Sequence, residues 1–309
     1  QCILPQTTPE TILSNPWYGK GFYEPQQYKV AIERCKNGYD SCESFIKLLE
    51  HRVKIERDYS TELKKWSLTW LKEIQHSQDY GTNKKTCLAL INTGEQQAYS
   101  HVKMADNLQE NVINKMLLYR RENYSRSLIH LQKVKEFEKD FEQAQKNWLK
   151  LLQKIDDAKK LYLDSSKKLK SYEQAEKIIQ SDSGKTDEQK QHVKLTVDTL
   201  KKDCSSQKVK YQQLIEEMKN MRPQYEISMN DVLERTNDFE RKRMNHFKQI
   251  FQDYHDTIYT PNDENLAKMS TDFKKVLSEH NVENDIQWWN THYGKYTESN
   301  WPVFEELKD

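Results

Sequence analysis

Side chains that commonly carry catalysis or bind metal ions are scattered along this chain. The nine histidines include His51, His76, His101 and His192, which lie in charged stretches, and no histidine pair has a carboxylate at metal-ligand spacing. The sequence contains no GxSxG, no GxxxxGKS/T loop and no GxGxxG. We therefore expect a protein that is not an enzyme and has no metal or other cofactor.

One short stretch has a different character. In RRENYSRSLIHLQKVK, residues 120–135, Leu128 and Ile129 follow Arg126 and precede several basic residues. Two adjacent apolar side chains among so many charges either belong to a helix core or contact something other than water and protein. Four residues spaced for one helical stripe support the helix core: Leu117, Tyr124, Leu128 and Leu131.

Composition favours long helices with narrow apolar seams. Of the 309 residues, 31% are charged and only 7 are glycine, and the mean hydropathy is −1.03. So few glycines leave little room for tight turns, and little apolar surface is available for a compact core. The 49 basic and 48 acidic residues nearly balance, so a globally basic nucleic-acid-binding protein is not indicated.

Neither a membrane span nor a disulfide framework is predicted. No run of 18 apolar residues is present, and the first residues, QCILPQTTPETIL, lack the pattern of a signal peptide. The cysteines are odd in number and include no CxxC, so we expect free thiols in a cytoplasmic protein. These are Cys2, Cys35, Cys42, Cys87 and Cys204.

The first half of the chain predicts two long helices. Residues 1–21 hold three of the seven prolines and are interpreted as a flexible segment. A helical pattern covers 22–76, and in the break that follows Gly81 is expected to end one helix and Thr82 to cap the next. A further apolar periodicity covers about 84–125.

The clearest periodicity begins at Phe137. Eight residues alternate steps of four and three and form one stripe: Phe137, Phe141, Ala144, Trp148, Leu151, Ile155, Ala158 and Tyr162. Thr186 and Gln189 then form a capping box that predicts a helix over 187–258, kinked at Pro223. A helix of that length predicts a molecule shaped as a rod or an arc.

The last part of the chain is rich in aromatic residues. Thr260 and Pro261 predict the start of a short helix that runs to about residue 280. Residues 281–309 show no helical period and are predicted as an extended tail that packs along a helix face, either of its own chain or of a partner. The aromatic residues expected in dimer or tail packing are Trp148, Trp288, Trp289, Trp301 and Phe304.

Residues 22–66, FYEPQQYKVAIERCKNGYDSCESFIKLLEHRVKIERDYSTELKKW, resemble the segment that opens F-BAR domains. The shared pattern is an aromatic start, a Gly-Tyr pair in the first helix, and then E-R-x-x-I-E-x-x-Y. Here His51 separates the Glu from the Arg. The matching positions are Glu50, Arg52, Ile55, Glu56 and Tyr59.

Three further segments resemble the syndapin (pacsin) branch of that family. They are FEQAQKNWLKLLQKIDDAKK at 141–160, RPQYEISMNDVLERTNDFERKR at 222–243 and DIQWWNTHYGKYTESNWPVFEE at 285–306. Asn147 replaces a proline of the family pattern in the first of them. The last segment is the most discriminating, and the resemblance covers about 22–307.

This resemblance implies a fold and a function. The fold is all-α, an elongated, kinked antiparallel helical bundle that forms a curved homodimer, with the F-BAR domain over 22–309. The implied function is to bind anionic phospholipids, such as phosphatidylserine and phosphoinositides, through a basic concave face in endocytosis and membrane remodelling. The implied location is cytoplasmic, at the plasma membrane and endocytic membranes. The resemblance also implies that dynamin and actin-nucleation factors bind relatives through a Src-homology-3 domain, which we expect this chain to lack.

The resemblance also assigns site residues. In the syndapin branch an apolar pair followed by two glycines forms a wedge loop, and Leu128 and Ile129 align with that pair, while His130 and Leu131 replace the glycines. Basic residues near this loop and along the following helix are the candidates for lipid binding. They are Arg126, Lys133, Lys135, Lys146, Lys150, Lys154, Lys159, Lys160, Lys167 and Lys168, with Lys54 and Arg57 in the first long helix.

Two alternatives from other classes remain at this point. A coiled-coil scaffold that binds proteins without touching lipid would have the same periodicity. A helical nucleic-acid-binding protein would use basic stretches such as FERKRMNHFK at 239–248. The three functions differ in whether the protein sediments with acidic vesicles or is retained on DNA or RNA.

Overall fold

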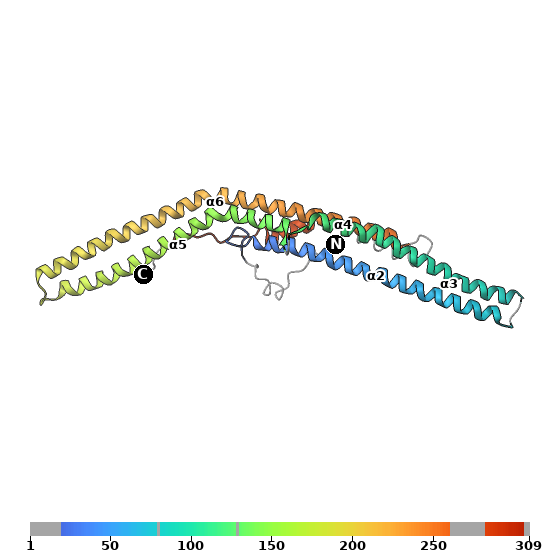
Figure 1. Ribbon diagram of the computed structural model, residues 1–309. Helices are drawn as coiled ribbons and strands as arrows, with labels where there is room; N and C mark the ends of the chain where they lie inside the picture. Colours follow the sequence, from blue (N-terminus) through green and yellow to red (C-terminus); the bar gives the residue numbers. More distant parts are fainter. Residues whose placement is uncertain (1–19, 79–80, 128–129, 260–281, 306–309) are drawn as a thin grey trace. The chain divides into compact units, whose positions relative to one another are not determined.

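The protein is almost entirely helical, as predicted. The computed structural model describes residues 20–78, 81–127, 130–259 and 282–305 (Figure 1). In chain order the elements are α2 (Lys29–His76), α3 (Gly81–Leu108), the π-helix η1 (Gln109–Ile113), α4 (Asn114–Asn123), β1 (Arg126–Ser127), β2 (His130–Leu131), α5 (Gln132–Ser181), α6 (Asp187–Ile258) and α8 (Val282–Tyr293).

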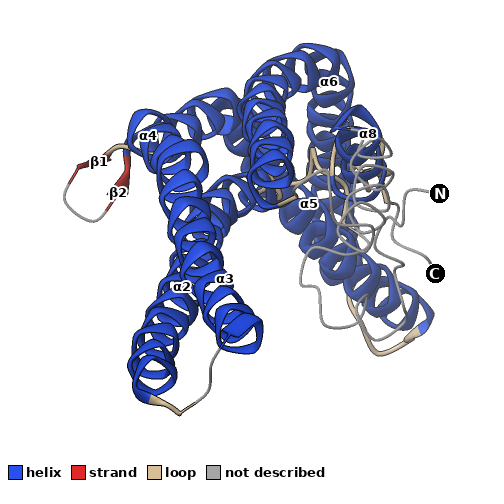
Figure 2. Cartoon of the chain, turned by 90° about the vertical axis from the view of Figure 1, so that its right-hand side faces the viewer, coloured by secondary structure: helices blue, strands red, loops and turns tan. Residues whose placement is uncertain are grey.

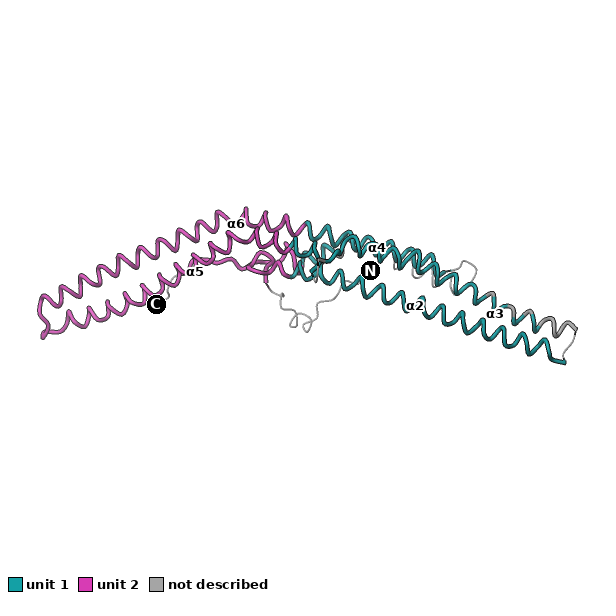
Figure 3. Tube along the Cα trace, viewed as in Figure 1, with its two compact units in different colours: residues 1–16, 30–137, 235–291 teal, residues 17–29, 138–234, 292–309 magenta. Residues whose placement is uncertain are grey.

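The described residues divide into two compact units, which Figure 3 shows in different colours. Unit 1 contains residues 30–137 and 235–291, and unit 2 contains residues 17–29, 138–234 and 292–309. Each unit has its own core, so each is described separately below.

In unit 1, α2 and α3 pair antiparallel. The Ser60 hydroxyl donates to the Ala98 carbonyl at 2.7 Å, and the Ser67 hydroxyl donates to the Ile91 carbonyl at 2.9 Å. The residue that is later in α2 thus bonds to the residue that is earlier in α3, so the two helices run in opposite directions. Both serines are buried, and their small side chains let the two helices approach while their hydroxyls remain hydrogen-bonded.

The C-terminal part of α6 runs parallel to α2 in the same unit. Arg34 donates to the Asn237 side-chain oxygen at 2.7 Å, and the Phe45 ring centroid lies 5.2 Å from that of Phe247. Within each pair the two residue numbers differ by about 200, so the two helices keep a constant parallel register. This packing buries the first turns of α2 against aromatic and amide side chains.

The π-helix η1 joins α3 to α4 without a break in the helical rod. Val112 and Ile113 are both fully buried. An α-helix turns neighbouring residues about 100° apart, and the wider π turn lets both face the core. Beyond it α4 runs antiparallel to α6, with the Tyr119 ring stacked on His246 at 4.2 Å and Lys115 paired with Asp253 at 2.7 Å.

The prediction of a non-helical tail after residue 281 is wrong for its first half, which is helix α8. Its buried positions are Val282, Ile286 and Asn290, spaced by four. The third is polar, and Asn237 donates to its side-chain oxygen at 3.4 Å. The helical period is not visible when only apolar residues are counted, because the third buried position holds an asparagine.

Unit 2 is an antiparallel pair formed by α5 and the N-terminal part of α6. Trp148 stacks on Tyr225 at 4.5 Å, and further along Tyr162 stacks on Tyr211 at 6.2 Å. The predicted α5 stripe is confirmed, since every member is buried except the half-buried Ala144. The bounds predicted for α6 are confirmed as well, with Pro223 inside the helix.

The predicted capping box at the start of α6 is confirmed. The Gln189 backbone N–H donates to the Thr186 hydroxyl, and the Thr186 backbone N–H donates to the Gln189 side-chain oxygen, each at 3.3 Å. Two of the N–H groups that a helix start leaves unpaired are satisfied in this way.

Residues 294–305 pack along α5 and α6 of their own chain. The Trp301 ring meets Trp148 edge-on at 5.4 Å, and the Phe304 ring lies 4.9 Å from Tyr211. The Asn300 backbone N–H also donates to Glu24 at 3.0 Å. The tail is therefore fixed by large aromatic contacts within unit 2.

Two predicted boundaries are wrong. α2 begins at Lys29, because residues 21–28 form turns around Pro25 and Gln26, whose φ is 67°. Gly81 begins α3, whereas the prediction had it ending the preceding helix. The short helix predicted at 260–280 and the flexible segment up to residue 19 lie outside the described residues. In the part of the chain that the structure describes, no helix combines the length and apolarity of a membrane span.

Candidate functional site

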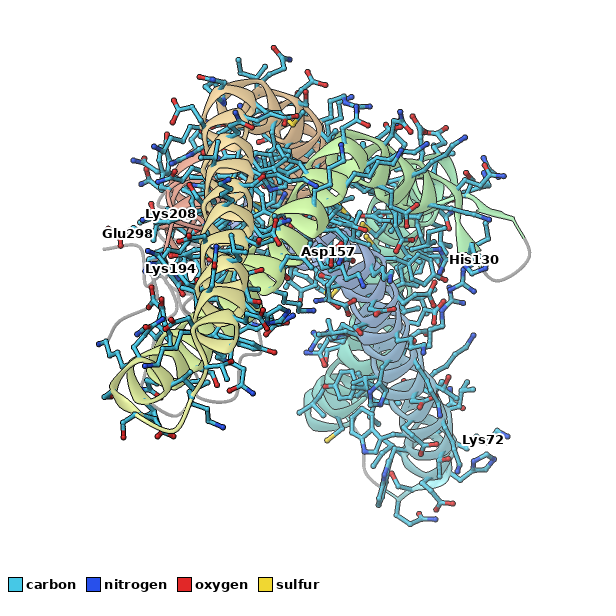
Figure 4. All side chains as sticks on the ribbon, turned by 90° about the vertical axis from the view of Figure 1, so that its left-hand side faces the viewer. Lys72, His130, Asp157, Lys194, Lys208 and Glu298 are labelled. Atoms are coloured by element: carbon cyan, nitrogen blue, oxygen red, sulfur yellow. The ribbon has the colours of Figure 1, made fainter. Side chains whose placement is uncertain are left out.

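A two-stranded hairpin follows α4 and lies outside the helices of unit 1 (Figure 2). Arg126 pairs with Leu131 and Ser127 with His130 in antiparallel register. The Gln132 backbone N–H donates to the Ser125 carbonyl at 3.0 Å, which closes the stem where α5 begins. His130 lies on the hairpin away from the helical ribbons in Figure 4.

The hairpin geometry contradicts a helix that continues through this stretch. α4 ends at Asn123, and its C-cap Tyr124 has φ −121° and ψ 44°, which are not helical values. Leu117, Tyr124 and Leu131 therefore do not share one helical stripe. Leu128 and Ile129 come between the two strands in sequence and lie outside the described residues.

Tyr124 anchors the hairpin to the bundle. Its side chain is buried, and its ring packs against Phe239 at 5.1 Å and Tyr39 at 5.9 Å. Gly38 lets α2 come this close, because a Cβ there would lie 2.5 Å from the Tyr124 hydroxyl. Burial raises the pKa of Tyr124 far above that of a solvated phenol. The side chain is therefore neutral at any physiological pH.

Charged side chains brace the foot of the hairpin. The Arg126 guanidinium lies over the Tyr39 ring, 4.4 Å from its centroid. The Tyr39 hydroxyl donates to Glu43 at 3.1 Å, and Arg120 on α4 pairs with the same carboxylate. Burial and then the bond to Glu43 raise the pKa of Tyr39, so its phenol remains a donor.

The predicted lipid-binding residues on α5 are mostly exposed, on the side away from its buried stripe. The exposed members are Lys135, Lys146, Lys150, Lys154, Lys160, Lys167 and Lys168. Acidic residues such as Asp157 and Asp164 share that side, so its charge is mixed.

Some predicted basic residues are already paired with carboxylates. Lys133 pairs with Glu136 at 3.0 Å and Lys159 with Glu305 at 2.6 Å. Arg57 on α2 pairs with Asp106 of α3 at 2.8 Å, while the neighbouring Lys54 is exposed. These paired groups are weaker candidates for lipid than Arg126 and the exposed lysines.

The predicted aromatic residues fall into two groups. Trp148, Trp301 and Phe304 come together in unit 2, as described above. Trp289 lies on α8 in unit 1, where the Arg34 guanidinium stacks on its ring at 3.7 Å, and Trp288 beside it is half-buried. The two groups therefore serve different packing roles.

Sequence reasoning missed a second apolar stripe on α2. Five large side chains recur at steps of seven and four on the side of the helix next to its buried face, and they are 39–60% exposed. They are Leu48, Ile55, Tyr59, Trp66 and Trp70. The spacing itself could have revealed this stripe, because it is the repeat of a helix that packs against another helix.

The comparisons with known proteins point to one family. Residues 27–103 match the model of the Fes/CIP4, and EFC/F-BAR homology domain. The chain is 25% identical to protein kinase C and casein kinase substrate in neurons protein 2 of Gallus gallus over 286 residues, which are 92% of this chain. It is 26% identical to the corresponding protein 1 of Danio rerio over 93% of its length. The chain spans 64% of the length of these two relatives.

A solved structure agrees with these matches. The EFC/F-BAR domain of Drosophila Syndapin/PACSIN superposes with a TM-score of 0.74 at 28% identity, covering 92% of this chain and 99% of that one. The similarity therefore extends well beyond the segment that the family model matches. Residues 27–103 thus resemble the Fes/CIP4 and EFC/F-BAR homology domain, and over most of its length the chain is similar to PACSIN/syndapin proteins.

Proposed function

We propose that this chain binds anionic membranes as a homodimer, deforms them, and inserts Leu128 and Ile129 into the bilayer. F-BAR domains as a family sense and remodel membrane curvature. The observation that most favours insertion is the hairpin at residues 126–131, which leaves the bundle next to a buried anchor, Tyr124. The site of action would be peripheral, on the cytoplasmic face of the plasma membrane and endocytic membranes.

Insertion of the apolar pair would be favourable on physical grounds. Moving a Leu or Ile side chain from water into an apolar medium contributes roughly 1.5–3 kcal/mol. A dimer would present four such side chains. The β1–β2 pairing and the bond from the Gln132 N–H to the Ser125 carbonyl would hold the inserted pair to the bundle.

Electrostatic attraction would bring the protein to the surface first. Arg126 belongs to the hairpin, and Lys135 lies exposed at the start of α5. Lys146, Lys150 and Lys154 continue along α5 at steps of four. Each basic residue near an anionic leaflet contributes about 1 kcal/mol, an effect that fades within a Debye length of about 8 Å. Binding should therefore weaken as salt is raised.

The second apolar stripe of α2 supports the homodimer. It extends from Leu48 to Trp70, about 33 Å of helix at 1.5 Å per residue. Replacing Leu48 and Ile55 by Glu would place charge in such an interface. Analytical ultracentrifugation should then show a monomer, whereas the same change at Leu195 and Ile227, exposed residues of α6, should leave the dimer intact.

The test of insertion compares the native protein with Leu128→Ser plus Ile129→Ser. With phosphatidylserine vesicles at low salt, the native protein should sediment and form tubules, and the variant should lose tubulation while its helicity and dimer remain. The matched control is Leu195→Ser plus Ile227→Ser, which removes the same two residue types from exposed sites on α6.

The rival function is a coiled-coil scaffold that binds proteins only. It predicts no sedimentation of the native chain with acidic vesicles at any salt concentration. If the Leu128→Ser plus Ile129→Ser variant unfolded or became monomeric, Leu128 and Ile129 would instead belong to the protein interior. Either result would contradict the proposed insertion.

A further inference from the structure

His130 follows the apolar pair directly and is the first residue of β2. Its backbone pairs with Ser127 across the hairpin, and its side chain is exposed and lies away from the helical ribbons (Figure 4). Within the described part of the chain its ring makes no hydrogen bond and no ion pair. The imidazole is therefore available to any surface that the hairpin meets.

The ring is a feature of this chain rather than of the pattern it resembles. In the syndapin pattern a glycine occupies the position of His130, as noted above. A glycine offers no side chain to a membrane surface. An effect of the ring on membrane binding would therefore go beyond what the resemblance implies.

Histidine differs from the other basic residues because its charge ordinarily changes between about pH 5 and 8. The neutral ring has one N–H donor and one acceptor nitrogen. The protonated ring is a cation with two N–H donors, which suits the phosphate oxygens of an anionic lipid. The strength of such a contact therefore depends on pH.

The charged side chains around the hairpin leave it net positive. Arg120 pairs with Glu43 of α2, and Lys133 pairs with Glu136 within α5. The other charged groups that adjoin the hairpin are Arg121 and Glu122 of α4, Arg126 of β1 and Lys135 of α5. Three of these four are basic, so an anionic leaflet attracts this region and a further positive charge would add to the attraction.

The neighbours of His130 do not change their charge near neutral pH. Arginine, lysine and carboxylate side chains ordinarily keep their charge between about pH 5.5 and 7.5. Burial raises the pKa of Tyr39 and that of Tyr124, so both phenols stay neutral there. Among the described residues at the hairpin, His130 is thus the one whose charge responds to pH in this range.

The position of His130 determines which layer of the membrane it would meet. Inserted apolar side chains enter the boundary between the headgroups and the acyl chains. Each residue of a strand advances about 3.4 Å, so His130 lies one step closer to the bundle than Ile129 and would be level with the headgroups. There an imidazolium meets lipid phosphate without the large cost of moving a charge into hydrocarbon.

Membrane binding and protonation would then favour each other. A leaflet at about −30 mV concentrates protons roughly threefold at its surface, so an imidazole there is protonated at a bulk pH about 0.5 unit higher. The bound state holds more protons than the free state. By linkage, the affinity for the membrane must rise as the pH falls.

We propose that His130 makes membrane binding by this hairpin dependent on pH: the protonated ring binds lipid phosphate at the level of the headgroups, and the neutral ring loses that contact. This inference rests on the proposed function and deepens it, because it adds regulation by protons to the insertion of Leu128 and Ile129.

The experiment measures the affinity of the full chain for phosphatidylglycerol vesicles at about pH 5.5, 6.5 and 7.5 and constant low ionic strength. The headgroup of this lipid is a phosphodiester, which keeps its charge over this range. The variant His130→Gln is neutral at every pH, and His130→Lys is charged at every pH. His192→Gln, at an exposed site on α6 in unit 2, is the matched control. Circular dichroism at each pH checks the fold.

The native affinity should rise about fivefold for each imidazole between the highest and the lowest pH, and so about 25-fold for a dimer, since one added charge near the leaflet has an effect of this size. His130→Gln should lose most of this rise, and His130→Lys should bind tightly at all three pH values. The His192→Gln control should follow the native protein. His246 is present in every variant, so its effect on stability is common to all of them.

Three results would overturn the proposal. They are a native affinity that does not change with pH, a His130→Gln protein that keeps the native pH dependence, and a His130→Lys protein that binds no more tightly than His130→Gln at the highest pH. Each leaves the proposed function in place, because the native protein still binds the vesicles. Absence of binding by the native protein at all three pH values would contradict the proposed function and this inference together.

Discussion

The hydroxyl of Tyr124 lies against the backbone of Gly38, where an added Cβ would come within 2.5 Å of the oxygen. This contact joins α2 to the residue from which the hairpin leaves α4. It also explains why a glycine is tolerated inside a long helix, where it usually lowers stability. The position of the hairpin thus depends on the absence of a side chain at Gly38 of α2.

Gly38→Ala should destabilise the protein even though alanine is the better helix former. Helix propensity alone would stabilise by about 1 kcal/mol. The new methyl would clash with Tyr124 and crowd Arg243, whose Cδ lies 3.1 Å from the Cβ position. Overpacking of this kind typically costs about 1–3 kcal/mol. Urea unfolding should give a net loss of stability, and a net gain would contradict the contact.

Tyr124→Phe should partly rescue that variant. The Tyr124 hydroxyl is buried with no hydrogen-bond partner, so its removal alone should change stability little. In the double variant Gly38→Ala plus Tyr124→Phe the closest clash is gone, while Arg243 still crowds the methyl. A double-mutant cycle should therefore give a favourable coupling, and strict additivity would argue against it.

Trp301 should be the main anchor of the aromatic tail. Its ring contacts Trp148 at 5.4 Å, and the Arg222 guanidinium lies 4.6 Å from its centroid. Trp301→Ala should cost about 2–3 kcal/mol, below the range for a fully buried tryptophan because the ring is half-buried. Hydrogen exchange of residues 294–305 should become faster. Val303→Ala, at a position 67% exposed, is the matched control and should leave exchange unchanged.

Stability should fall in mild acid because of His246. Burial lowers the pKa of His246 below its usual value of 6.5, and this effect outweighs that of the nearby Asp253 carboxylate, which raises the pKa. The unfolded chain binds this proton at a higher pH than the folded chain does. The free energy of unfolding should therefore be highest above pH 6.5 and decrease as pH falls from 6.5 toward the folded pKa.

His246→Phe tests this assignment, because it keeps a ring next to Tyr119 and removes the titrating group. The variant should show a flatter dependence of stability on pH between about 5.5 and 7. His192→Phe, at an exposed site, is the control and should retain the native profile. Identical profiles for the native protein and His246→Phe would contradict the role of His246.

The four described cysteines should fall into two reactivity classes. Burial raises the pKa of Cys35 to about 12 and that of Cys42 to about 11, so little thiolate forms at pH 8. Cys87 and Cys204 are half-exposed. In a Cys2→Ser background, thiol labelling of the native protein should show two fast sites and two that react only after unfolding. Rapid labelling of Cys35 would disprove its burial.

The long helices could be predicted because their signals are local. The α5 stripe and the capping box at Thr186 and Gln189 depend only on spacing along one chain segment, and both are confirmed. The start of α2 could not be predicted in the same way. Residues 21–28 are held in turns by contacts with distant partners, such as the bond from the Phe22 N–H to Thr297.

Buried polar residues explain most of what the sequence did not reveal. Asn290 interrupts the apolar stripe of α8, and Ser60 and Ser67 occupy core positions of α2 where hydrogen bonds to α3 satisfy them. Such residues look like surface residues until their partners are known. The hairpin likewise depends on the contact between Gly38 and Tyr124, which are distant in sequence. The roles of Leu128, Ile129 and the basic residues in lipid binding stay predictions.

The most direct measurement of membrane insertion is the environment of a probe at position 129. Ile129→Cys, in a background with the other reactive cysteines replaced by serine, is labelled with a nitrobenzoxadiazole dye, and Leu195→Cys serves as the matched site. With phosphatidylserine vesicles at low salt we expect a blue shift and quenching by brominated acyl chains at residue 129 only. Unchanged emission at residue 129 while the protein sediments with the vesicles would contradict insertion.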